Sequence, residues 1–263
     1  MNNYHTHTTF CDGNSSPEEF VKKAIELGMK EIGFSAHSYT EFDSSCCLSL
    51  EKTNLYKQEI NRLKKAYEGQ IKIYLGIEQD YYSNQPTDDY NFVIGSVHYV
   101  KKNGEYIAVD AFKDKQLKQV QKHYGNYMDF VADYYNLVSD VYNKTKCNII
   151  GHFDLITKFN GGGELFDEQS QKYISLAQES AKVVAGQNTF VEVNTGAIAR
   201  GYKSSFYPAE NLLSILASSG KPFVLSSDAH KLEHLNFGLD EAKQKLDKLG
   251  YKTISGLAEI IKW

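Results

Sequence analysis

The sequence of 263 residues has no long apolar run and no pattern that would fix disulfide bonds. No stretch approaches the roughly 20 apolar residues of a membrane-spanning helix. The first three residues have neither the charged region nor the apolar run of a signal peptide. The four cysteines form no C-x-x-C pair, and Cys46 and Cys47 are adjacent, so neither a zinc knuckle nor a disulfide framework is indicated. These absences predict a cytoplasmic protein with reduced thiols and no membrane contact.

An excess of positive charge is also missing. The formal net charge is −4 and the sequence pI is near 6.1. Non-specific attraction to nucleic acid or to an anionic membrane needs a basic face. We therefore expect a small-molecule substrate and no nucleic-acid partner, while the oligomeric state stays open.

The sequence alternates short apolar segments of strand length with helical patterns, and it contains no internal repeat. The strands are expected at residues 4–7, 30–37, 71–78, 90–98, 147–154, 189–194 and 221–227. The helices are expected at residues 17–27, 50–67, 114–143, 167–184 and 240–249. Such alternation implies parallel pairing through right-handed crossovers, and seven successive units favour a closed or nearly closed barrel over an open, doubly wound sheet.

Histidines and acids stand where these strands end. His5 and His7 are one residue apart, so both side chains leave the strand on the same side. Asp12 follows at the Gly13 turn and offers a carboxylate to the same region. Taken alone, this short motif is equally consistent with a strand end that happens to carry two imidazoles. The other strand ends decide the matter, because they carry His37, Glu78, His98, His152, Asp228 and His230.

A barrel gathers residues at the carboxyl ends of its strands into one active site. So many imidazoles and carboxylates in one place would repel one another or lack partners, and metal binding removes that difficulty. The number of ligands indicates two or three divalent ions, with Glu78 as a bridging carboxylate. Nitrogen and oxygen ligands without thiolate suit Zn²⁺, Mn²⁺ or Fe²⁺ better than Mg²⁺ or Ca²⁺.

These residues resemble the motifs of the PHP (polymerase and histidinol phosphatase) superfamily of metal-dependent phosphoesterases. The matching motifs, in order, are His5-Thr-His7-Thr with Asp12-Gly13, Ser35-Ala36-His37, Gly76-Ile77-Glu78, Gly95-Ser96-Val97-His98, Gly151-His152-Phe153-Asp154, Glu192-Val193-Asn194-Thr195 and Ser227-Asp228-Ala229-His230. The resemblance implies a distorted (β/α)7 TIM-like barrel with a trinuclear metal centre. It covers nearly the whole chain, so we expect a single domain over residues 1–263.

The resemblance also implies how the ligands are shared. His5, His7, Glu78 and Asp228 would hold the first ion, and Glu78 would bridge to a second ion held by His98 and His152. Asp12, His37 and His230 would hold the third, whose occupancy is the least certain, because some relatives have a histidine where Asp12 stands. Glu78, Asp228 and His230 form the expected catalytic group.

The implied reaction is hydrolysis of a phosphate monoester by a metal-bound hydroxide. Arg200 is the candidate for holding the phosphate, since a guanidinium binds two phosphate oxygens at once, and Lys158 is a second candidate. Each could instead be an exposed surface cation. Asp154 is a candidate for orienting His152 or another ligand, with helix capping as its alternative.

Two histidines fall outside the ligand set. His123 is expected to be structural, with a loop-facing substrate contact as its alternative. His234 is expected at the surface, with an i, i+4 metal pair with His230 as its alternative.

Three functions follow. The first is a phosphatase acting on L-histidinol phosphate, because the length of the chain and the Glu192 motif resemble those of such phosphatases. The second is a PHP enzyme acting on nucleotides or nucleic acid, and the third is a metal-binding accessory module without turnover. The complete ligand set argues against the third.

Overall fold

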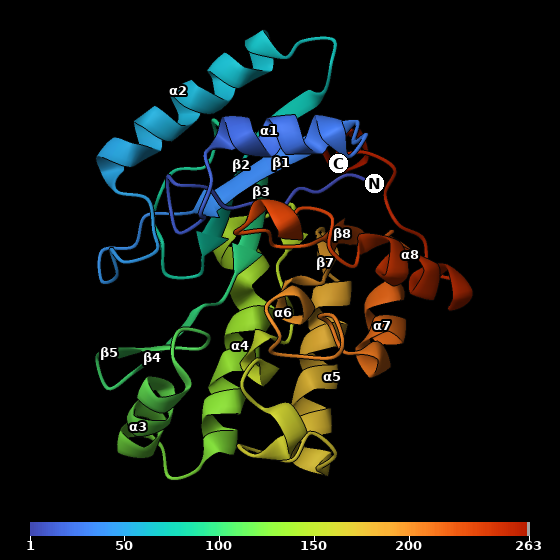
Figure 1. Cartoon of the computed structure of the whole chain (residues 1–263). Coiled ribbons are helices and arrows are strands. Elements are labelled where there is room, and N and C mark those ends of the chain that lie inside the picture. Colours follow the sequence, from blue (N-terminus) through green and yellow to red (C-terminus); the bar gives the residue numbers. More distant parts are fainter. Residues whose placement is uncertain (262–263) are drawn as a thin grey trace.

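A computed structural model describes residues 1–261, and its centre is a curled sheet of parallel strands with helices packed around it (Figure 1). The strands are β1 Glu31–His37, β2 Lys72–Asp80, β3 Phe92–Ser96, β4 Tyr99–Lys102, β5 Glu105–Ala108, β6 Ile149–Ile150, β7 Phe190–Asn194 and β8 Val224–Ser226. The helices are α1 Pro17–Glu26, α2 Leu50–Ala66, α3 Lys113–His123, α4 Tyr127–Thr145, α5 Gln171–Ala185, α6 Gly196–Ala199, α7 Glu210–Ala217, α8 Leu239–Lys248 and α9 Ala258–Ile261.

Six strands make the main sheet in the order β1-β2-β3-β6-β7-β8. All five pairings are parallel, which confirms the α/β class that the alternation predicts. The strand order follows the chain order, so each strand lies beside its predecessor, as in a barrel wall. An open, doubly wound sheet would instead reverse its strand order part-way, and it is therefore ruled out.

Residues 3–7 lie between the two edges of this sheet. On one side, the N–H of Gly33 in β1 donates to the Asn3 carbonyl at 2.9 Å. On the other side, the N–H of His7 donates to the Ala229 carbonyl at 2.8 Å, and the Ala229 N–H donates to the His5 carbonyl at 3.0 Å. The predicted first strand is thus present as two isolated parallel bridges, and it joins the sheet edges into a barrel.

The first helix begins as its sequence predicts. The Ser16 side chain caps the helix, the Glu19 carboxylate reaches back to the Ser16 N–H at 2.8 Å, and Pro17 takes the first helical position. Helices α4 and α5 run side by side on one flank of the sheet (Figure 1). The largest apolar cluster joins the sheet to the surrounding helices, including α1, α2, α4, α5, α7 and α8, and it contains the fully buried Phe34 and Phe130.

The structure corrects four sequence-based expectations. The helix expected at 114–143 is two helices, α3 and α4, because the chain extends at Tyr124 and Asn126 caps a new helix by accepting the Asp129 N–H. The expected loop after residue 98 contains the antiparallel hairpin β4–β5. The strands expected at 147–154 and 221–227 shorten to β6 and β8. Helix α7 was not anticipated at all.

The end of the chain packs against the sheet as far as it is described. Leu257 and Ile260 are buried beside Tyr4 and Phe92. The last two residues, including Trp263, lie outside the described part of the chain. Across residues 1–261, every helix is too short or too polar to span a bilayer.

Candidate metal centre

All nine predicted ligands come from the carboxyl ends of the strands or the turns that follow them. Parallel strands present these ends at one mouth of the barrel, so the side chains converge. The cluster contains four overlapping groups, and within each group the donor atoms all lie within 4.8 Å of one another. They are His7, Asp12, His37 and His230; His5, His7 and Asp228; His5, Glu78 and His152; and His37, Glu78 and His98.

Glu78 is the centre of the cluster. Its Oε2 lies 3.3 Å from His5 Nε2, 3.5 Å from His7 Nε2 and 2.8 Å from His37 Nδ1. Its Oε1 lies 3.2 Å from His98 Nε2 and 3.0 Å from His152 Nε2. One carboxylate therefore faces five imidazoles, which is the arrangement expected of a bridging ligand.

Asp228 belongs to the group with His5 and His7. Its Oδ1 lies 3.6 Å from His5 Nε2 and 3.3 Å from His7 Nε2. The Asp228 backbone has φ of 48°, in the left-handed region that non-glycine residues seldom adopt. Arg200 secures this conformation, donating from Nη1 to the Asp228 carbonyl at 2.8 Å and from Nη2 to Oδ2 at 2.9 Å.

Asp12, in the turn after residues 3–7, belongs to the group with His7, His37 and His230. Its Oδ1 lies 3.6 Å from His37 Nε2, and its Oδ2 lies 3.3 Å from His230 Nε2. His7 also belongs here, because its ring stacks on that of His230 with centroids 4.1 Å apart. Of the nine residues, Asp12 and His230 are among the most exposed, at 31% and 22% of the side chain.

The donor atoms fit divalent ions. His5 Nε2, His7 Nε2 and Glu78 Oε2 are buried and make no hydrogen bond to any described residue. A buried polar atom without a hydrogen bond costs free energy, and here three such atoms lie close together beside Asp228. Nitrogen and carboxylate donors in this number suit zinc, manganese or iron. The cluster can hold metal ions.

The protonation of the cluster follows from its crowding. Burial alone would lower the pKa of His5, but the carboxylates of Glu192, Glu78 and Asp228 raise it well above its usual range. Burial would likewise raise the pKa of Glu78, but His5 and the neighbouring imidazoles hold it well below its usual range. For His7, burial and its histidine neighbours lower the pKa to about 3. Without ions, neutral and charged imidazoles thus surround ionised carboxylates.

Behind the cluster, two carboxylates hold histidines from the far side. Glu192 on β7 lies with Oε2 2.9 Å from His5 Nδ1, and Asp80 on β2 lies with Oδ2 3.2 Å from His98 Nδ1. The sequence analysis gave neither residue a role. The alternation along β2 was an available signal, because Asp80 is two residues after Glu78 and so lies on the same face of the strand.

Comparisons with known proteins agree with this geometry. Residues 3–196 match the family described as the PHP domain, which is well over half of the chain. The chain belongs to the PHP family. Its predicted membership, drawn from the motifs at the strand ends, is confirmed.

Several PHP relatives match over almost their whole length. The chain is 28% identical over 266 residues to a probable histidinol-phosphatase of Deinococcus radiodurans, covering 95% of this chain and 94% of the relative. It is 24% identical over 263 residues to a histidinol-phosphatase of Bacillus subtilis, covering 90% and 96%.

A solved PHP structure shares the fold. The histidinol phosphate phosphatase of Lactococcus lactis, determined with zinc, L-histidinol and phosphate, has a TM-score of 0.72 and 24% identity, covering 96% of this chain and 95% of that one. With this likeness the expected TIM-like architecture is confirmed.

Arg200 and Lys158, the two cationic residues expected to bind the substrate, lie beside the cluster, and each already has a partner within the chain. Arg200 is bound to Asp228, as described above. The Lys158 ammonium donates to the Asp110 carbonyl at 2.7 Å and lies 3.3 Å from its Oδ2. Lys158 is 9% exposed, so the solvated-surface alternative is wrong for it.

Within the described residues, the Asp154 carboxylate makes no hydrogen bond or ion pair with the His152 ring. Its Oδ2 accepts the Ala209 N–H at 2.9 Å, so it ties down the start of α7 instead of orienting a ligand or capping its own helix. His123 is structural, as expected, because its Nε2 pairs with Glu105 Oε2 at 3.1 Å and links α3 to the hairpin. His234 is partly buried and lies outside the groups of potential ligands.

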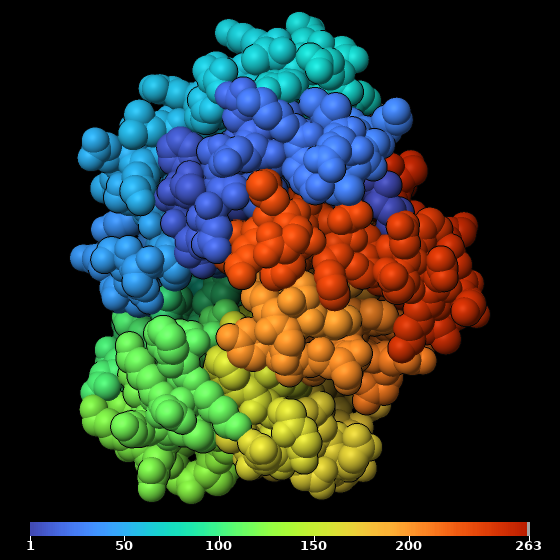
Figure 2. All heavy atoms as spheres, in the orientation of Figure 1, coloured from blue at the N-terminus to red at the C-terminus, as the bar shows by residue number. Residues whose placement is uncertain are grey.

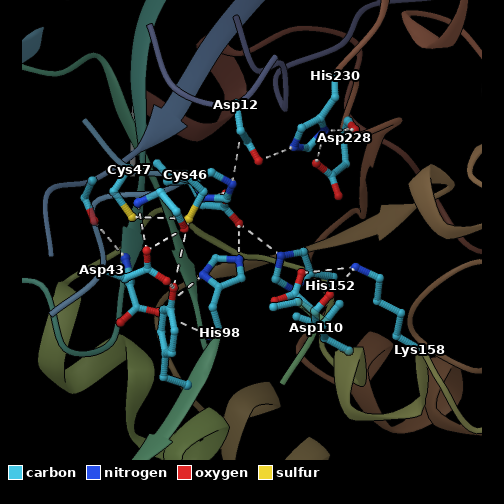
Figure 3. A pocket seen from close by; sticks show the side chains of 18 of the residues that line it. Asp12, Asp43, Cys46, Cys47, His98, Asp110, His152, Lys158, Asp228 and His230 are labelled. Carbon is cyan, nitrogen blue, oxygen red and sulfur yellow. Dashed lines mark hydrogen bonds and ion pairs between the residues drawn. The ribbon is translucent and has the colours of Figure 1, made fainter. Parts of the chain in front are cut away.

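A pocket of 460 Å³ opens onto the cluster. Figure 2 shows the hollow where the blue N-terminal part, the green hairpin region and the orange segment around residue 200 meet. Inside it, Asp12, Asp228 and His230 lie on one side, Asp43, Cys46 and Cys47 on another, and Asp110 with Lys158 on a third (Figure 3). Tyr99, Phe112 and Tyr202 also line the pocket.

Proposed function

We propose that the chain is a metal-dependent phosphatase that hydrolyses L-histidinol phosphate to L-histidinol and inorganic phosphate. The observation that carries the proposal is a cluster of buried donor atoms without hydrogen bonds, His5 Nε2, His7 Nε2 and Glu78 Oε2, beside a pocket that Glu78 lines. The histidinol-phosphatase relatives, matched over almost their whole length, supply the substrate.

The residues would hold two or three divalent ions, with zinc, manganese and iron as the candidates. His5, His7, Glu78 and Asp228 hold the first, Glu78, His98 and His152 the second, and Asp12, His37 and His230 the third. Ions at this cluster supply Lewis-acid activation of a phosphoryl oxygen and of water. Glu78 keeps the first two sites together, because its two oxygens face different sets of imidazoles.

Arg200 brings a fixed positive charge to the pocket beside Asp228, where the oxygens of a phosphate need such a partner. Asp228 and His230 line the same wall, and with Glu78 they form the catalytic group. Lys158 adds a second cation at the pocket wall. The acids and aromatic rings on the remaining walls suit the amine and the imidazole of the substrate.

The same proposal treats residues 1–263 as one catalytic domain, because segments from His5 to His230 contribute to a single cluster. It places the enzyme in histidine biosynthesis in the cytoplasm. The four cysteines are free thiols, which suits a reducing compartment.

The test is phosphate release from L-histidinol phosphate by metal-loaded protein. A nucleoside monophosphate, a short oligonucleotide and an aryl phosphate are compared in parallel, and chelated protein and an Asp228→Ala variant serve as controls. We expect metal-dependent preference for L-histidinol phosphate. Preference for the nucleotide or oligonucleotide would overturn the substrate, and no turnover of any ester at full metal occupancy would overturn the enzyme.

A further inference from the structure

Glu192 is a buried carboxylate that the proposed reaction does not use. It lies on β7, is 0% exposed, and does not line the pocket. Its carboxylate nevertheless contacts residues from four segments, two of which carry candidate ligands. Ionised carboxylates are seldom buried without strong hydrogen bonding, so its place behind the cluster needs a reason.

Four donors surround Glu192. Its Oε2 lies 2.9 Å from His5 Nδ1 and accepts the Ser226 hydroxyl at 2.6 Å. Its Oε1 accepts the His152 N–H at 2.6 Å and the Asn194 amide at 2.8 Å. A carboxylate, which only accepts, is the one side chain of this size that satisfies four donors.

We infer that Glu192 is a positioning residue that keeps the proton of His5 on Nδ1, so that Nε2 is presented to a metal ion at the His5, His7 and Asp228 group. A ligating imidazole needs such a partner on its other nitrogen, which fixes both the tautomer and the plane of the ring. Here Nε2 is the buried atom without a hydrogen bond, and it faces Glu78 and Asp228. This inference rests on the metal binding of the proposed function.

Glu192→Gln tests the inference because the hydrogen-bond partners of residue 192 determine which way the oxygen and the NH₂ group of the glutamine point. The His152 N–H is a backbone donor and needs an acceptor. The Asn194 amide cannot reverse at no cost, since its Oδ1 accepts the Gly196 N–H at 2.8 Å. The oxygen of Gln must therefore face His152 and Asn194. Its NH₂ group then faces His5 Nδ1, which must accept, and the proton of His5 moves to Nε2.

The control is Glu31→Gln. Glu31 is also a buried strand carboxylate, and its Oε2 accepts the Tyr4 hydroxyl at 2.6 Å and the Leu257 N–H at 2.9 Å. None of its hydrogen bonds or ion pairs within the described residues involves a histidine. It therefore reports the effect of removing a buried charge without touching the ligands.

Zinc affinity is measured by competition with a chromogenic chelator for wild type and both variants, with circular dichroism as the check on folding. We expect Glu192→Gln to weaken one class of zinc site by about 10- to 100-fold, and Glu31→Gln to bind zinc like wild type. Equal zinc affinity in Glu192→Gln and wild type would overturn the inference. If wild type itself bound no metal, the proposed function would fail instead.

A second measurement needs no variant. In zinc-loaded wild type with ¹⁵N-labelled histidine, long-range ¹H–¹⁵N spectra identify which nitrogen of His5 carries the proton. We expect the proton on Nδ1 and the metal-bound shift on Nε2. The reverse assignment would overturn the inference, whether or not Glu192→Gln folds.

Discussion

Glu78→Gln should destabilise the metal-free protein in a way that depends on pH. The carboxylate faces imidazoles at 2.8 to 3.5 Å, and three of them, on His5, His37 and His98, have pKa values raised well above 6.5. One charge pair at about 3 Å contributes roughly 5 kcal/mol of attraction at an effective dielectric constant of about 20. The free-energy cost of desolvating the charged groups offsets most of the attraction between them. Removing one partner of a buried pair typically costs about 3–5 kcal/mol.

The sign of the pH dependence follows from the two kinds of group. The raised imidazole pKa values give stability that is complete below about pH 6.5 and is lost as the pH rises through the folded values. The depressed pKa of Glu78 gives stability that is present above about pH 4.5. The contribution of Glu78 is therefore largest near pH 6 and smaller near pH 9, which lies above the ordinary imidazole pKa of 6.5, so that part of the stabilisation has been lost.

The assay is urea denaturation of chelator-treated wild type and Glu78→Gln at both pH values. At pH 6 we expect a loss of about 3–5 kcal/mol, which for 263 residues corresponds to a fall of about 5–9 °C in the melting temperature. At pH 9 the loss should be smaller. Glu59→Gln, which removes a partly exposed partner of Arg62, is the control and should cost less than about 1 kcal/mol. The same loss at both pH values would refute this electrostatic account.

Three further outcomes are expected. Arg200→Ala should lower kcat/KM for L-histidinol phosphate by about 10²- to 10³-fold, and unchanged steady-state kinetics would rule out a role in binding the phosphate. Zinc binding at pH 7 should release protons, because the pKa values of His5, His37 and His98 are raised in the metal-free protein; titration calorimetry in two buffers of different ionisation enthalpy measures this, and identical heats would contradict it. Phe20→Ala, at a fully buried position of α1, should lower the free energy of unfolding measured in urea by about 3–5 kcal/mol. A loss below about 1 kcal/mol would show that neighbouring side chains fill the cavity.

The barrel and the cluster could be anticipated because they rest on local patterns. His37 ends an apolar run, Glu78 ends another, and the parallel arrangement places such ends at one mouth of the barrel. The break between α3 and α4 also had a local signal. Asn126 stands three residues before Asp129, a helix start that the apolar periodicity on either side concealed.

The walls of the site could not be anticipated in the same way. Asp110 meets Lys158 because the β4–β5 hairpin turns the chain back over the pocket, and nothing near residue 110 indicates that approach. Glu192 stands in a motif that the sequence analysis recognised, yet its role depends on four donors brought together by the fold. Pairing between distant segments is a property of the tertiary structure, and local spacing does not encode it.

Because residues 3–7 bridge the two edges of the sheet, the order in which the ribosome synthesises the chain affects when the metal centre can form. Asn3 donates to Ser227, which follows it by 224 residues, and His7 pairs with Ala229. At about 5–20 residues per second, the first histidines are synthesised about 10–45 s before these partners. Over that interval the segment lacks its partners on the β8 side. The site is completed only when the last strand has been translated, so a prematurely terminated chain lacks it.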